Sequence, residues 1–329
     1  MARHRTFQEG RRVATVHESM SPAIVELDAN DIPEVCELFQ KVFGHAISPE
    51  LWRWKYTQGP RLGSINLVAR AATGQLLGHV GASIFPGTVQ RAALSMAQVC
   101  DVMVRSSARG GLAASDVYPR LIKTLQGTLA ARFVSPYAYG FAGVRPYKLG
   151  SRLGFYRELQ QCRPGYFVQS GAADWGRALW RAREIEWNFP RLDRIWARYK
   201  AQLTRPTVSR TGAYLGWRYL THPTNSYRLW LLTHLSRDRG LFITRTMPNG
   251  EICIIDALIP DFVNPSRLIA ALDVALTTSA TESPPIFAWF LPPGHNQLVE
   301  PVIGSEVRVN HWHTRYPNPR FQPGDTDVY

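Results

Sequence analysis

The first 160 residues alternate between two hydrophobic periodicities, one typical of strands and one typical of helices. Short apolar runs bounded by turn residues predict strands at 24–27, 65–71, 76–85, 94–104 and 137–141. Helical spacing of apolar residues predicts one helix over 32–42, ended by Gly44, and another over 117–129. A Pro at position 49 is typical of a first helical turn and starts a third predicted helix, over 49–56. This alternation indicates an α/β fold.

The segment that joins the strand ending at Val104 to the next helix has the composition of an anion-binding loop. Free N–H groups at a helix start and the helix dipole both favour negative charge. Gly110 and Gly111 let the backbone approach a bulky pyrophosphate, and Arg105 and Arg109 add positive charge. An ordinary tight turn stays open as the alternative.

The order of these elements resembles the GNAT superfamily of acyl-CoA N-acetyltransferases over about residues 24–160. The resemblance is carried by Val104, Arg109-Gly110-Gly111, Ala114 and Leu153-Gly154-Phe155. It implies an α+β fold, a mixed, mostly antiparallel twisted sheet flanked by helices, with acetyl-CoA or another acyl-CoA as co-substrate and no metal. The residues implied to hold that co-substrate are Val102, Met103, Val104, Arg105, Arg109, Gly110, Gly111, Leu112, Ala113 and Ala114.

Two positions depart from the family pattern. Leu112 stands where the family's first loop glycine falls, with Gly111 one place early. Gly150 stands where a tyrosine often protonates the departing thiolate, four residues before Gly154. The nearest substitute is Tyr147, one helical turn away.

Two side chains are candidates for the proton transfers that acyl transfer to an amine requires. The amine must be neutral when it attacks, and the leaving thiolate needs a proton. Asp101 is a charged residue in an apolar strand, and we expect it either to accept the amine proton, directly or through water, or to bond a neighbouring loop. Tyr147 is the candidate general acid, with a packed helix aromatic as its alternative.

The second half of the chain repeats a motif of the first. Trp54-Lys55-Tyr56 reappears as Trp217-Arg218-Tyr219, and each copy has a Pro four residues after its Tyr. The strands and helix that follow recur in the same order, including an aspartate at 101 and again at 256. These repeats predict two GNAT-like domains in tandem, although one mixed α/β domain with an unrelated cap remains the alternative.

The two copies differ at the phosphate loop. Where the first copy has Arg109-Gly-Gly, the second has Pro260, Asp261 and Pro265. Proline removes a backbone donor and an aspartate repels phosphate, so we expect no cofactor site in the second copy. This second domain would serve as a structural or acceptor-binding half.

The predicted organisation is a flexible tail over 1–20, an N-terminal GNAT domain over 21–168, a helical connector over 169–207 and a C-terminal GNAT-like domain over 208–329. The connector is rich in tryptophan at roughly helical intervals, with Arg between. Its aromatics favour packing between domains. A lining for an aromatic, sugar or acyl acceptor and a basic membrane-surface segment are the other interpretations.

Composition changes this picture in one respect. The chain has 329 residues and a formal net charge of +13. A positive field steers anionic partners, but the basic residues are scattered and no nucleic-acid signature appears, so nucleic acid is disfavoured as a partner.

The four Cys are widely spaced, which favours neither disulfides nor a metal site, and no apolar run reaches membrane-span length. We expect a cytoplasmic protein, with a homodimer left open.

Three functional hypotheses follow. The first is an acyl-CoA-dependent N-acyltransferase that acts on a small-molecule amine. The second is an aminoacyl-tRNA-dependent transferase of the peptidoglycan (Fem-like) type, which also uses twin GNAT-like domains but would not need the Arg-Gly-Gly loop. The third is a non-catalytic CoA- or ligand-binding protein, motivated by Gly150 at the tyrosine position.

Overall fold

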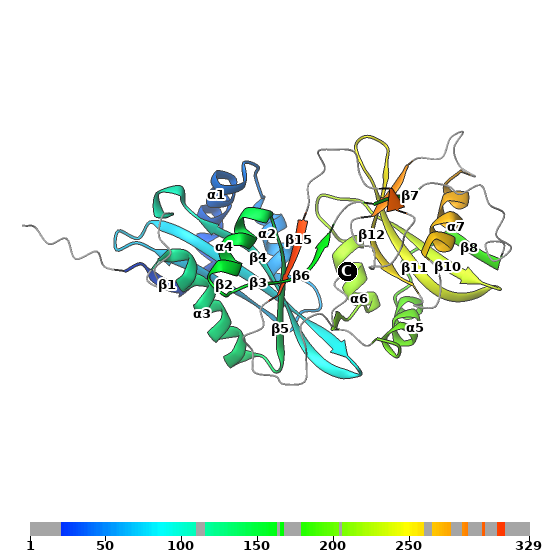
Figure 1. The fold of residues 1–329 in the computed structure, drawn as a ribbon, viewed down its shortest axis with the longest axis horizontal. Coiled ribbons are helices and arrows are strands. Elements are labelled where there is room, and N and C mark those ends of the chain that lie inside the picture. The colour runs from blue at the N-terminus through cyan, green and yellow to red at the C-terminus, as the bar shows by residue number, and fades with distance from the viewer. Residues whose placement is uncertain are drawn as a thin grey trace, which may run out of the picture.

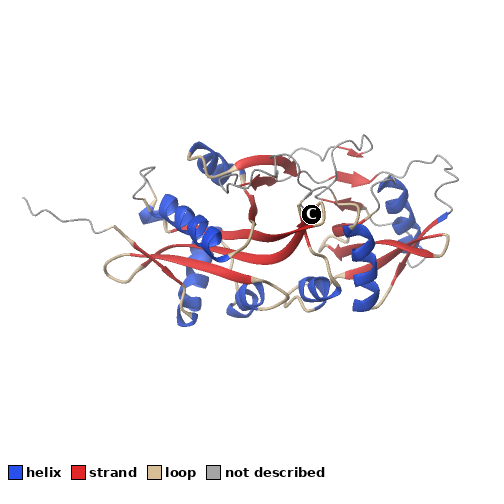
Figure 2. Cartoon of the chain, turned by 90° about the horizontal axis from the view of Figure 1, so that it is seen from below, coloured by secondary structure: helices blue, strands red, loops and turns tan. Residues whose placement is uncertain are grey.

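The computed structural model describes residues 21–109, 116–162, 165–167, 179–203, 206–259, 265–277, 285–288, 298–299 and 308–312. Two lobes lie side by side along the long axis of the molecule (Figure 1). Each lobe is built around one sheet, with helices packed against it (Figure 2). The predicted fold class, mixed twisted sheets flanked by helices, is therefore confirmed.

The first sheet has its strands in the order β1-β2-β3-β4-β5-β15-β6, and β9 adds to β3. Their bounds are β1 Ala23–Glu26, β2 Gly63–Arg70, β3 Leu76–Val89, β4 Ala92–Val104, β5 Pro136–Ala142, β6 Arg157–Cys162, β9 Thr207–Val208 and β15 Arg308–Trp312. Neighbours are antiparallel except for β4 and β5, which pair in parallel.

The second sheet has the order β8-β10-β11-β12-β13-β7-β14. Its strands are β7 Gly165–Phe167, β8 Trp180–Glu184, β10 Arg228–His234, β11 Arg237–Thr246, β12 Ile252–Leu258, β13 Ile286–Ala288 and β14 Leu298–Val299. Among the strands that the structure describes here, only β12 and β13 pair in parallel. The two sheets thus share one pattern of strand directions. In each, the sixth strand crosses over from the other lobe's stretch of chain: β15, the last described strand, enters the first sheet, and β7, which follows β6 in the chain, enters the second.

Helices cover both faces of the first sheet because successive strand residues point to opposite sides. The helices of this lobe are α1 Ile32–Phe43, α2 Pro49–Thr57, α3 Val117–Arg132 and α4 Val144–Arg152. Leu67 on β2 packs in the cluster under α3, while its neighbour Val68 packs under α1 and α2. Gly44 ends α1, as predicted, and does so in the left-handed conformation, at φ 78°. Pro119 lies in the first turn of α3, where a proline is tolerated.

The second lobe holds α5 Phe189–Lys200, α6 Gly212–Leu215, the one-turn π-helix Gly216–Leu220 and α7 Pro265–Thr277. Leucines of α7 pack on one face of its sheet, and α5 and α6 pack on the other. Within 169–207, expected as a helical connector, the structure describes strand β8 as well as α5 and β9. Strand β8 was not predicted. None of the described helices is long and apolar enough to cross a membrane.

Candidate functional site

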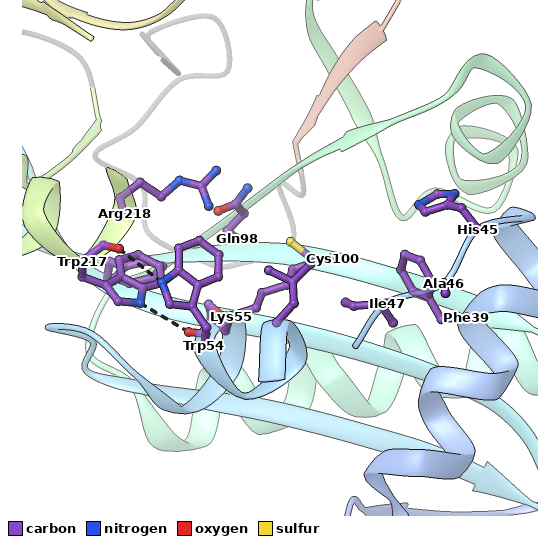
Figure 3. A pocket seen from close by; sticks show the side chains of 13 residues that line it. Phe39, His45, Ala46, Ile47, Trp54, Lys55, Gln98, Cys100, Trp217 and Arg218 are labelled. Carbon is purple, nitrogen blue, oxygen red and sulfur yellow. Dashed lines mark hydrogen bonds between the residues drawn. The ribbon is translucent and has the colours of Figure 1, made fainter. Parts of the chain in front are cut away.

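The repeated aromatic triplets meet where the two lobes touch. The rings of Trp54 on α2 and Trp217 on the π-helix stack with their centroids 4.9 Å apart. Each indole N–H donates to the backbone carbonyl of the other tryptophan, at 3.2 and 3.3 Å (Figure 3). Both side chains are buried. The repeat found in the sequence therefore forms a nearly symmetric contact that fixes one lobe against the other.

The tyrosine of each triplet binds the repeated aspartate. Tyr56 donates to Oδ2 of Asp101 at 2.6 Å, and Tyr219 donates to Oδ2 of Asp256 at 2.8 Å. In both copies a cation completes the cluster. For Asp256 this cation is Arg210, whose Nε lies 2.9 and 3.0 Å from the two carboxylate oxygens.

Asp101 lies at a bulge of β4. The β3–β4 register shifts beside it, and its backbone has φ 51°. Lys55 donates to both carboxylate oxygens, at 2.7 and 2.8 Å. Burial alone would raise the pKa of Asp101, but the Lys55 ammonium and the hydrogen bonds from Lys55 and Tyr56 outweigh burial and hold this pKa below its usual value.

A carboxylate with a lowered pKa and two occupied oxygens is a weak base. The equivalent Asp256 sits in the copy without a predicted cofactor loop, and it is held in the same way. This geometry favours the structural alternative for Asp101, in which the carboxylate positions Lys55. Proton acceptance by Asp101 stays a prediction.

A pocket of about 310 Å³ opens beside the tryptophan pair (Figure 3). Its walls come from α1, the α1–α2 loop, α2, β3, β4 and the π-helix. The lining residues are Phe39, His45, Ala46, Ile47, Leu51, Trp54, Lys55, Ser83, Phe85, Gln98, Cys100, Trp217 and Arg218. This volume is at the lower end of the range for small-molecule sites. Burial raises the pKa of the Cys100 thiol, so the pocket does not present a thiolate nucleophile.

The pocket borders the point where β4 and β5 stop pairing. Their parallel ladder ends at Gln98 and Tyr139, although β4 continues to Val104 and β5 to Ala142. No further β4–β5 pairing occurs within the described parts of both strands. An extended ligand chain that enters between them would find strand edges able to hydrogen-bond to it.

The predicted cofactor-binding residues divide into two groups. Val102 to Val104 end β4, and Arg105 and Arg109 follow. Nε of Arg105 donates to the Leu76 carbonyl and Nε of Arg109 to the Val104 carbonyl, at 3.0 and 2.7 Å. Their terminal nitrogens make no hydrogen bond to described residues, which suits them to a diphosphate. Gly110, Gly111, Leu112, Ala113 and Ala114 lie outside the described residues.

The candidate general acid lies on α4. Tyr147 is half-buried there. At Gly150, one turn further on, a Cβ would lie 2.0 Å from the ring of Tyr156. The ring of Tyr156 therefore takes the space of a side chain at position 150. Sequence reasoning missed this, although Tyr156 directly follows the Leu-Gly-Phe motif.

The ring of His222 also packs against the tryptophan pair, with its centroid 4.3 Å from that of Trp54. Its Nδ1 accepts hydrogen bonds from the backbone N–H groups of Thr224 and Asn225, which the neutral ring alone can do. Burial, followed by the positive charges of Arg218 and Arg245, lowers the pKa of His222 to about 4.

We therefore expect acid to destabilise the fold through His222. Since the unfolded histidine binds its proton below about 6.5, the free energy of unfolding should fall as pH drops from 6.5 to 4. Denaturant unfolding at several pH values measures this slope, which His222→Gln should reduce. His45→Gln, which removes an exposed histidine, is the control. Equal slopes in the two variants would contradict the prediction.

Comparisons with known proteins agree with this architecture. Residues 23–158 match the family described as the acetyltransferase (GNAT) domain. No curated protein matches the sequence significantly. Among the described residues no group of three His, Cys, Asp or Glu side chains is placed to hold a metal ion.

Three solved structures illustrate the similarity. One is a conserved protein from Enterococcus faecalis, described as a probable N-acyltransferase. It is 10% identical to this chain with a TM-score of 0.59, and the match covers 81% of this chain and 64% of the Enterococcus protein. GCN5-related N-acetyltransferases from Kribbella flavida and Anabaena variabilis have 12% and 14% identity, TM-scores of 0.61 and 0.58, and 88% coverage of this chain. This chain covers 70% and 72% of those two. At these identities the likeness concerns the fold.

Proposed function

We propose that this protein is an acyl-CoA-dependent N-acyltransferase, with acetyl-CoA as the first candidate donor, that transfers the acyl group directly to a small amine. The observation that carries the proposal is the domain match over 23–158, which spans the complete β4 strand, the arginines after it and α3. Two observations support it further: the β4–β5 ladder ends at Gln98, and the pocket that Gln98 also lines has the volume of a small-molecule site.

In the proposed reaction the neutral amine attacks the thioester carbonyl carbon. A C–N bond forms, the C–S bond breaks, the amine loses a proton and the thiolate gains one. Backbone groups of Val102 to Val104 would bind the pantetheine chain, and Arg105, Arg109 and the loop through Ala114 would bind the diphosphate. Asp101 holds Lys55 and remains the candidate proton acceptor, and Tyr147 is the candidate acid.

We also propose that the chain carries two GNAT-like domains in tandem, with the cofactor site in the first. The support is the shared order of strand directions, together with the Tyr–Asp–cation cluster that each lobe contains. Strands β7 and β15 then exchange sheets. Pro260 and Asp261 lie outside the described residues, so the loop of the second copy remains an expectation.

Calorimetry with acetyl-CoA tests the placement of the cofactor loop. We expect micromolar binding, abolished by Arg109→Glu because the variant places a negative charge beside the diphosphate. Gly110→Val should weaken binding without unfolding the chain, since the backbone could no longer approach the phosphates closely. Arg91→Glu is the control, because Arg91 lies at the β3–β4 turn, at the opposite end of β4 from Val104.

A thiol-release assay over a panel of amines then tests turnover. Release of CoA with any amine supports the proposal. Acetyl-CoA binding without turnover would favour a non-catalytic binding protein, and salt-sensitive tRNA binding without acetyl-CoA binding would favour the aminoacyl-tRNA-dependent alternative. Unchanged acetyl-CoA affinity in Gly110→Val would contradict the placement of the loop.

A further inference from the structure

We infer that the pocket between the lobes recognises its acceptor by a carboxylate, which pairs with the guanidinium of Arg218. This inference rests on the proposed acyl transfer and names the class of its acceptor. That class is a small amine that also carries a carboxylate and an apolar body, as an amino acid does.

The two copies of the triplet use their cations differently. In the first copy, Lys55 is the cation that binds the repeated aspartate. In the second copy that place belongs to Arg210, which lies outside the triplet and forms a buried ion pair with Asp256. Arg218, the counterpart of Lys55, is consequently displaced from the aspartate. It lines the pocket instead.

The guanidinium of Arg218 has no anionic partner among the described residues. Figure 3 shows its end beside the Gln98 side chain, with no hydrogen bond to the other residues drawn. Its contact is a cation–π interaction with the Trp54 ring, 5.7 Å from the centroid. The arginine is half-buried, and a partly desolvated cation favours an anion beside it.

Within the part of the chain that the structure describes, the neighbouring charges leave this cation uncompensated. Lys55 is neutralised by Asp101, and His222 is uncharged at neutral pH. His45, which also lines the pocket, brings no negative charge. The pocket therefore carries a net positive charge at Arg218, whose planar fork matches a carboxylate in bidentate geometry.

The remaining walls fit the rest of such an acceptor. Phe39, Ile47, Leu51 and Phe85 provide apolar surface for an aliphatic or aromatic body. On β4 the pocket reaches Gln98, where pairing with β5 ends, and Cys100, next to the Asp101–Val104 segment beside which the donor is proposed to bind. An acceptor anchored at Arg218 can thus extend its amine along β4 toward the donor.

Calorimetry on the full chain tests this inference with matched probes. L-phenylalanine and L-phenylalaninamide, or L-leucine and L-leucinamide, differ only in the carboxylate. We expect at least one acid to bind about tenfold or more tightly than its amide, as a charge-assisted pair predicts. Arg218→Gln should abolish this preference. Arg218→Lys, which keeps the charge but loses the fork, should retain part of it.

Arg228→Gln is the matched control, because Arg228 also lies over a tryptophan, Trp230, but outside the pocket. This variant should keep the full preference, and circular dichroism verifies that each variant is folded. Equal binding of acid and amide in both pairs, absence of binding, or a preference that survives in folded Arg218→Gln would overturn the inference. Because amino-acid binding is measured without acetyl-CoA, failure of the acyltransferase proposal would appear separately, as absence of thiol release.

Discussion

Replacing Arg210 by Met is expected to lower the free energy of unfolding by about 3–5 kcal/mol, because it leaves the buried Asp256 carboxylate without its counter-charge. Both side chains of this ion pair are 3% exposed. Tyr219 and the backbone N–H of Ala257 would still donate to Asp256, but neither neutralises the charge. Denaturant unfolding followed by circular dichroism measures the loss.

Arg191→Met provides the control. Arg191 pairs with Asp238 through two hydrogen bonds of 2.7 Å, but both side chains are about one-quarter exposed. Water can solvate the remaining carboxylate, so we expect a loss of about 1 kcal/mol or less. In the double variant Arg210→Met/Asp256→Leu much of the stability should return, because no unpaired charge is left. Equal losses in Arg210→Met and Arg191→Met would refute the argument.

The second large effect is expected for Trp217→Ala, about 3–5 kcal/mol of unfolding free energy, because a large buried ring leaves a cavity. Trp217 is 8% exposed and packs against Trp54, Phe85 and Tyr214. Its loss also removes the N–H that donates to the Trp54 carbonyl. Denaturant unfolding is again the measurement.

Substitutions by Phe separate the two contributions. Trp217→Phe and Trp54→Phe keep an aromatic ring but lose one indole N–H each, so both should cost less than Trp217→Ala. A cycle with the double variant measures the coupling between the two rings. If Trp217→Ala cost no more than Trp217→Phe, the stacking of the rings would contribute little.

The local elements of this fold follow from short stretches of sequence. Gly44 and the apolar spacing before it were enough to predict α1, and Pro49 was enough to predict the start of α2. The repeated Trp–basic–Tyr triplet was also visible, because its residues are adjacent in the chain. The triplet did not reveal that the two tryptophans stack on each other, since that contact depends on how the lobes pack.

The pocket could not be predicted for the same reason. In the sequence repeat, Arg218 of the pocket corresponds to Lys55, which predicts that it binds Asp256. Only the structure shows that Arg210 binds Asp256 in its place. Strand β8 was missed because tryptophans at near-helical intervals obscure a short edge strand whose first residue, Trp180, is buried. The space over Gly150 is likewise filled by a ring six positions away, a contact that the helical pattern does not specify.

The insertion of β15 between β5 and β6 has a consequence for biosynthesis. Residues 308–312 are made after all the other described residues, yet among the described strands β6 contacts the rest of its sheet only through them. Until β15 is made, the edge of β5 lacks the strand that covers it, and we expect such an open edge to be prone to association with other chains. Completion of the lobe that carries the proposed cofactor site thus depends on a strand that is made after the described strands of the other lobe.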